Sequence, residues 1–142
     1  MGKGSKKFGV ILTTVISALL FCSLIVVTSL SPLSELGPNA NTFNSVGMWS
    51  AIGMVLFFYT IPLVIYAAGV GMMRFIMAGF CSIGIFIHLS MLGAVLIMGS
   101  GADSFPYFFE IVAICIVSFI VNIIWFFQAF RTSTKPATFM TK

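Results

Sequence analysis

Residues 8–30 read FGVILTTVISALLFCSLIVVTSL, a run of 23 residues without a charged side chain. An α-helix rises 1.5 Å per residue, so about 20 apolar residues are enough to cross the roughly 30 Å of hydrocarbon in a bilayer. The run exceeds the roughly 7–15 apolar residues of a cleavable signal peptide, and no small-x-small cleavage site follows it closely. We therefore expect this segment to be a retained transmembrane helix.

The rest of the chain has the same character. Of the 142 residues, 60% are hydrophobic and 7% are charged, whereas soluble domains have roughly 45–50% apolar and about 25% charged residues. Three further runs are long enough to span a bilayer, at residues 47–70, 75–98 and 107–130. The connections at 31–46, 71–74 and 99–106 contain Gly, Pro, Asn or Ser, which end helices and form turns. The sequence therefore predicts one transmembrane domain over residues 1–142, with a tail at 131–142.

The charged residues predict how these spans are oriented. Four crossings place all basic residues on one side: Lys3, Lys6, Lys7, Arg74, Arg131, Lys135 and Lys142. The three acids, Glu35, Asp103 and Glu110, fall on the other side. Basic residues near span ends mark the cytoplasmic face. We therefore expect an all-α integral membrane protein of the cell membrane, an antiparallel four-helix bundle with both termini in the cytoplasm.

A layer of polar side chains lies inside the predicted spans. At 1.5 Å per residue, His88, Ser118, Cys115 and Cys22 lie at about the same depth, and Asn122 lies about 7 Å closer to the basic side. Cys115, Ser118 and Asn122 recur at i, i+3 and i+7, so they share one helix face. Lipid cannot satisfy a hydroxyl, an amide or an imidazole. We expect these five side chains to face the interior of the bundle.

This layer has two interpretations. An ionisable residue within a membrane is a candidate for an ion or proton pathway, and a histidine titrates near neutral pH. A relay usually also needs a buried carboxylate, however, and every acid here lies at the outer rim. A neutral His88, hydrogen-bonded to Ser118 or to a free carbonyl, is the structural alternative, which we favour. Cys22, His88 and Cys115 include ligand types for copper or zinc, but no spacing brings them together, so we predict no metal and no cofactor.

Pro62 interrupts the second predicted span. A proline removes the hydrogen bond that the carbonyl of Phe58 would otherwise accept, which bends a helix. We expect a static kink at this point, with Tyr59 or Thr60 compensating for the freed carbonyl. A kink that gates a pathway is the alternative.

The ends of the spans carry other features that face water. Glu35, Asp103 and Glu110 form a candidate outer acidic rim, which could collect cations or a basic peptide. We favour the simpler interpretation that they stabilise a helix N-terminus. Helix starts are predicted at four candidate caps: Asn44, Ser45, Asp103 and Ser104. Four aromatic residues fit belts at the membrane surfaces: Trp49 and Tyr107 outside, Tyr66 and Trp125 inside.

The run LTTVISALLFCSLIVVTSLSPLSELGPNANTFNSVGMW, from Leu12 to Trp49, resembles small four-span membrane proteins of bacilli-type bacteria that carry only a domain-of-unknown-function label. The layout of the remaining chain is compatible with that family. The resemblance implies a location in a bacterial plasma membrane. It transfers no activity and no site residue.

The sequence favours a protein that works by binding. We find no nucleotide-binding loop, buried carboxylate or catalytic set in it, so we predict that it is not an enzyme. We expect an accessory, regulatory or protective subunit that acts through helix–helix and lipid contacts. Its expected partners are anionic headgroups at the cytoplasmic face and another membrane protein or a second copy, and nucleic acid is not among them. A small oligomeric transporter or channel that uses the His88 layer is the alternative.

Overall fold

The computed structural model describes residues 2–35, 38, 40–98 and 105–131. Its long helices are α1 (Gly2–Leu30), α2 (Val46–Ala67), α3 (Met73–Met98) and α4 (Phe105–Phe130), and a short 3-10 helix, η1 (Pro32–Glu35), follows α1. Each long helix contains a segment of 22–25 residues that is apolar and long enough to cross a membrane. The predicted all-α class and the four apolar helices are therefore confirmed.

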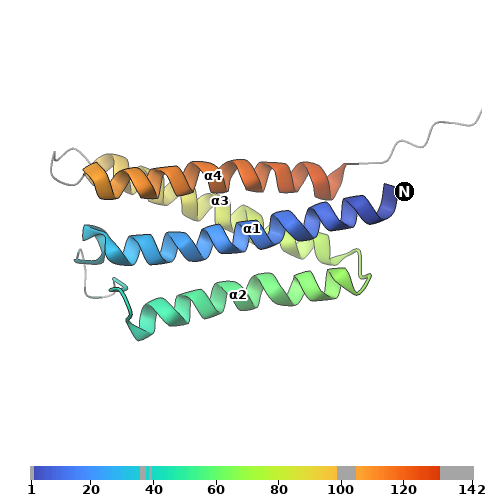
Figure 1. Ribbon diagram of the computed structural model, residues 1–142, viewed down its shortest axis with the longest axis horizontal. Helices are drawn as coiled ribbons and strands as arrows, with labels where there is room; N and C mark the ends of the chain where they lie inside the picture. Colours follow the sequence, from blue (N-terminus) through green and yellow to red (C-terminus); the bar gives the residue numbers. More distant parts are fainter. Residues whose placement is uncertain (1, 36–37, 39, 99–104, 132–142) are drawn as a thin grey trace, which may run out of the picture.

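The four helices lie side by side and alternate in direction along the chain (Figure 1). α1 packs on α2 and α4, and α3 packs on the same two helices. The start of α1, the α2–α3 turn and the end of α4 lie at one end of the molecule (Figure 1). We call this end the basic end, because it carries Lys6, Lys7, Arg74 and Arg131. We call the opposite end, which carries Glu35 and Glu110, the acidic end.

The first helix is longer than predicted. α1 begins at Gly2 rather than near residue 8, so it includes the lysines that precede the apolar run. Lys7 Nζ donates a hydrogen bond of 2.7 Å to the carbonyl oxygen of Ala67, the last residue of α2. The last carbonyls of a helix lack intrahelical partners and carry partial negative charge. The lysine therefore stabilises the end of α2 and ties the start of α1 to the bundle.

The start of α2 is capped as the sequence predicts. The side-chain oxygen of Ser45 accepts a hydrogen bond from the Met48 N–H at 3.2 Å. The bond satisfies one of the N–H groups that have no carbonyl partner in the first turn of a helix. Ser45 is therefore the N-cap of α2.

A glycine ends α2 earlier than the hydropathy predicts. The Gly69 N–H donates to the Tyr66 carbonyl at 3.0 Å, and the Val70 N–H donates to the Ile65 carbonyl at 3.3 Å. This pair of bonds is a Schellman motif, which places a residue in the left-handed region. Gly69 has a φ of 116°, which glycine adopts without the steric cost of a Cβ. The helix thus stops at Ala67 although the residues that follow are apolar.

Helix α2 continues through Pro62, which is buried. The prediction names Tyr59 or Thr60 as compensation for the proline. The Tyr59 hydroxyl does not provide it, because it is buried without a hydrogen-bond partner among the described residues. The ring is aimed across the bundle, and a Cβ on Gly84 of α3 would lie 3.4 Å from its oxygen. The hydroxyl therefore lies away from the backbone of its own helix. The kink itself stays a prediction.

The core has two apolar clusters, one toward each end of the bundle. The cluster toward the basic end consists of Val10, Met77, Cys81 and Trp125. The cluster toward the acidic end consists of Leu24, Val95, Phe108, Ile111 and Cys115. Trp125 is fully buried, so its predicted place in an interfacial aromatic belt is wrong. Its indole N–H finds a partner on a neighbouring helix instead of at a membrane surface.

Candidate functional site

Two hydrogen bonds join α1 to α4, and one of them is made by Trp125 of the cluster toward the basic end. Trp125 Nε1 donates to Thr14 Oγ1 at 2.7 Å, and Ser17 Oγ donates to Asn122 Oδ1 at 3.1 Å. We call these four residues the polar seam. Each of their side chains is at most 2% exposed. A buried polar group without a partner costs about 1–3 kcal/mol. If the two helices separated, the groups of the polar seam would lose their partners and incur this cost.

The polar seam fixes how α1 and α4 are aligned along their axes. Thr14 and Ser17 are three residues apart on α1, and Asn122 and Trp125 are three residues apart on α4. Residues with this spacing are neighbours on one helix face. Because the two helices run antiparallel, the two pairs match across the interface, one helical turn apart. A shift of either helix by one residue would break both bonds.

The seam is also anchored to the backbone of each helix. The Thr14 hydroxyl donates to the Val10 carbonyl at 2.7 Å. Asn122 Nδ2 donates to the Ser118 carbonyl at 2.9 Å, so the carboxamide uses both its oxygen and its nitrogen. The Ser118 hydroxyl is buried and has no partner. Asn122 is thus a structural contact between helices, whereas Ser118 contributes its backbone.

His88 is held by its own helix. The residue is 3% exposed, and Nδ1 lies within hydrogen-bond distance of the Gly84 carbonyl oxygen, one turn earlier on α3. A carbonyl oxygen can only accept, so Nδ1 carries a proton. Nε2 is buried without a partner. The ring packs edge-on against Phe21 of α1, with the two centroids 5.2 Å apart. In the neutral ring, Nε2 is an acceptor that has no partner among the described residues.

A cavity of about 180 Å³ adjoins this histidine between α3 and α4. Its lining residues are His88, Leu89, Leu92, Cys115, Ile116, Phe119 and Ile120. None of these side chains carries a negative charge, and an unpaired charge in apolar surroundings is very costly. The surroundings of His88 thus favour the neutral ring over an imidazolium.

The other layer residues lie where their helix faces predict. Cys115 is buried, Cys22 is half-buried, and both are free thiols, as is the buried Cys81. Within the described part of the chain, no group of three or more His, Cys, Asp or Glu side chains is placed to hold a metal ion. Of the predicted layer, His88 and Cys115 line one cavity, and Asn122 is the member that the described structure links to another helix by a side-chain hydrogen bond.

The candidate acidic rim is described in part. Glu35 is the last residue of η1 and is exposed, and Glu110 is exposed on α4. Asp103 lies outside the described residues, as does the predicted cap Ser104. The structure thus describes two exposed acids at the acidic end.

A second polar feature lies where α1 and α4 meet at the basic end. A pocket of about 350 Å³ is lined by Lys6, Phe8, Gly9, Gln128 and Arg131. We call it the basic notch. Gly9 leaves the space in which the Gln128 carboxamide lies, because a Cβ at Gly9 would be only 2.6 Å from Gln128 Oε1. A larger residue at this position would push the carboxamide out of the notch.

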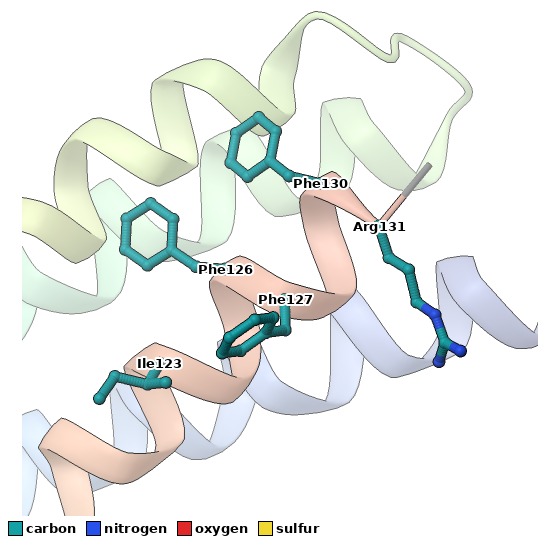
Figure 2. A pocket seen from close by; sticks show the side chains of 5 residues that line it. All are labelled: Ile123, Phe126, Phe127, Phe130 and Arg131. Carbon is teal, nitrogen blue, oxygen red and sulfur yellow. The ribbon is translucent and has the colours of Figure 1, made fainter. Parts of the chain in front are cut away.

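An apolar pocket adjoins the basic notch on the surface of α4. It has a volume of about 760 Å³ and is lined by Ile123, Phe126, Phe127, Phe130 and Arg131. Figure 2 shows Phe126 and Phe130 pointing toward α3, whereas Arg131 points to the other side of α4, toward α1. Arg131 lines both pockets. Cationic and apolar surface therefore meet at this residue.

Sequence reasoning missed two residues of these sites. Ser17 completes the polar seam, and Gln128 forms a wall of the basic notch. A usable signal was present for the seam: the first and fourth spans each carry two hydrogen-bonding side chains three residues apart. The notch has no comparable signal, because it depends on how the two helix ends are aligned.

Comparison with known proteins assigns the chain to a family. The model of DUF5391, described as a family of unknown function, matches residues 1–134. The chain belongs to this family. The uncharacterized protein YxaJ of Bacillus subtilis (strain 168) is 44% identical over 138 residues, which cover 96% of this chain and 98% of that relative. No solved structure matches the chain at a significant level.

These matches confirm the resemblance to a bacilli-type family of unknown function. The polar seam and the basic notch both lie within residues 1–134, which the DUF5391 model matches. They are therefore features that other members of DUF5391 can be tested for.

Breaking the polar seam should destabilise the bundle cooperatively. We expect a double-mutant cycle with Ser17→Ala and Asn122→Ala to give a coupling of about 0.6 kcal/mol, the average for hydrogen bonds between membrane helices, and at most about 1.7 kcal/mol. The measurement is the free energy of unfolding of each variant in mixed micelles, followed by circular dichroism.

A matched control for this cycle replaces Ser17→Ala by Thr28→Val. The Thr28 hydroxyl bonds only to carbonyls of α1 itself, those of Leu24 and Ile25, at 2.8 and 3.0 Å. The effects of Thr28→Val and Asn122→Ala should be additive. Equal coupling in the two cycles would contradict the role given to Ser17.

Proposed function

We propose that the chain is a multi-pass protein of the bacterial plasma membrane, with both termini in the cytoplasm. Four helices of sufficient length and apolarity support insertion. Their alternating directions gather Lys6, Lys7, Arg74 and Arg131 at the basic end (Figure 1). Basic residues near span ends mark the cytoplasmic face, and anionic headgroups there attract each of them by about 1 kcal/mol. The relative from Bacillus subtilis supports a bacterial membrane.

Within that membrane, we infer that the protein works by binding another membrane component, as an accessory, regulatory or protective subunit and not as an enzyme. The observation that carries this proposal is the use of the polar side chains in the bundle. Ser17, Asn122, Thr14 and Trp125 are committed to joining α1 to α4. These residues hold the scaffold together, so the surface for a partner is to be sought on the outside of the helices.

The outer face of α2 offers such a surface. Ser50, Gly53 and Thr60 lie on one side of the helix and are exposed, as is the bulkier Phe57 between Gly53 and Thr60. We call the three small residues the α2 face. A Cβ at Gly53 would meet no heavy atom of the described chain within 4 Å. In membranes, small residues let two helix backbones approach closely, and hydroxyls form hydrogen bonds between helices. The α2 face thus suits a helix of another membrane protein or of a second copy.

A transporter or channel is the second candidate. It is favoured by one observation, the buried lone pair of His88 Nε2, which has no partner and lies beside a cavity. Such an acceptor could take up a proton or a solute hydrogen bond during transport. The apolar wall of that cavity favours the binding proposal over transport, because an ion passing along it would lose its hydration without compensating contacts.

The proposed topology predicts the location of both chain ends. A reporter that is active only in the cytoplasm should be active when fused before Met1 or after Lys142, and a reporter active only outside should be silent at both sites. The reason is that an even number of spans returns the chain to its starting side. External activity at either end would contradict the topology.

The α2 face predicts a defect in partner binding. Affinity capture of the tagged protein from native membranes in mild detergent should recover a second protein or a differently tagged second copy. Gly53→Leu should lower this recovery about tenfold, because a bulky side chain prevents close helix packing. The matched control is Gly79→Leu on α3, because Gly79 is also exposed and has no heavy atom within 4 Å of its Cβ position. This control should leave the recovery unchanged. Repeated recovery of the protein alone would contradict the proposal.

The two candidates make opposite predictions for transport. Under the binding proposal, liposomes containing the purified protein should show no more proton flux than empty liposomes. A flux that His88→Ala removes while the variant stays folded would establish the transporter instead. A flux that the variant leaves unchanged would exclude His88 from the pathway.

A further inference from the structure

We infer that the basic notch and the adjoining apolar pocket together bind one anionic phospholipid. Its phosphate lies between Lys6 and Arg131, and an acyl chain follows the aromatic surface of α4. This inference rests on the proposed placement of the basic end at a membrane surface. It adds a defined ligand site to the proposed function.

The charges in the notch call for an anion. Lys6 and Arg131 line the same pocket, and none of the residues described as lining it is acidic. The described acids, Glu35 and Glu110, lie at the acidic end (Figure 1). Two neighbouring cations repel each other. A phosphate between them removes the repulsion and accepts charge-assisted hydrogen bonds from both.

Two other cations of the basic end, Lys7 and Arg74, have partners within the protein. Lys7 donates to the Ala67 carbonyl at 2.7 Å. The Arg74 guanidinium lies over the ring of Phe75, 5.1 Å from its centroid. A cation above an aromatic ring is attracted by the negative face of the ring. Lys6 and Arg131 line one pocket, which places them to hold an external anion together.

The notch has the space and a neutral donor for a phosphate. Its volume of about 350 Å³ corresponds to roughly ten waters at about 30 Å³ each, enough for a phosphate and the glycerol attached to it. The Gln128 carboxamide lies across Gly9 with Oε1 buried and unpartnered. Its N–H₂ group can donate to a phosphate oxygen. This set of groups recognises a phosphate rather than a bare hydrocarbon surface.

The apolar surroundings identify the phosphate as part of a lipid. Phe8, which lines the notch, is 66% exposed, and Phe127 of the neighbouring pocket is 73% exposed. Arg131 connects the two pockets. Free phosphate would leave this apolar surface unused, whereas an acyl chain covers it. Basic pockets between membrane helices at the cytoplasmic side are established sites for anionic headgroups.

Native mass spectrometry of the full chain in a neutral detergent tests the site. Three probes are added at equal concentration: dioleoyl phosphatidylglycerol, dioleoyl phosphatidylcholine and glycerol phosphate without acyl chains. The wild-type chain should bind one phosphatidylglycerol about 30-fold more tightly than phosphatidylcholine, the effect of two cations close to one anion. Glycerol phosphate should bind no better than phosphatidylcholine.

Substitutions identify the groups responsible. Lys6→Gln and Arg131→Gln should each lower the preference for phosphatidylglycerol by several-fold, and both together should remove it. Arg74→Gln is the matched control, since it deletes one positive charge from the same end outside the notch. Gln128→Glu adds an acid to the lining of the notch. It should remove the preference, and a cooperative melting transition in phosphatidylcholine micelles shows that the variant folds.

Three results would overturn the inference. These are equal binding of the two lipids by the wild-type chain, binding of glycerol phosphate as tight as that of phosphatidylglycerol, and a loss of preference in Arg74→Gln as large as in Arg131→Gln. A chain with the proposed topology but no lipid preference would refute the site alone. A chain that is washed from membranes by carbonate would refute the proposed function first.

Discussion

Polar side chains in the middle of apolar helices must find their partners on the same helix or on a neighbouring one. In this chain, the strongest expression of that constraint is the pair of hydrogen bonds that join Ser17 to Asn122 and Trp125 to Thr14. Hydrocarbon packing tolerates sliding between helices, whereas these bonds form in one alignment. Once they are made, the rest of the α1–α4 interface follows. Two turns further toward the basic end, Gly9 meets the Gln128 side chain.

The same alignment builds the basic notch. Lys6 lies one turn before Gly9, and Arg131 lies three residues after Gln128, so the two cations reach the end of the interface together. A structural contact in the middle of the bundle thus positions charges at its edge. The two sites differ chemically. The side chains of the polar seam bond to one another, whereas the notch is lined by two cations and by no acid among the described residues. A ligand is therefore expected at the basic end rather than among the polar groups at the helix centres.

His88 illustrates how far residue type alone can guide a functional hypothesis. The sequence singles it out as an ionisable group within an apolar span. The structure gives its Nδ1 a carbonyl of its own helix and surrounds the ring with hydrocarbon and Phe21. Trp125 shows the opposite error. Its position near a span end indicates an interfacial residue, yet it is at the centre of an apolar cluster because Thr14 satisfies its indole N–H.

The sequence by itself determined the helix class, the approximate helix bounds and the end of the bundle at which the described charges lie. These properties depend on hydropathy, turn residues and chain direction, which are local or additive along the chain. The tertiary structure decided which polar groups meet: Ser17 with Asn122, and Lys6 with Arg131 in one notch. Such pairs join residues more than a hundred positions apart. They depend on the rotation and axial alignment of whole helices. Side chains along the full length of each helix set that alignment together, so no short stretch of sequence encodes the pairs.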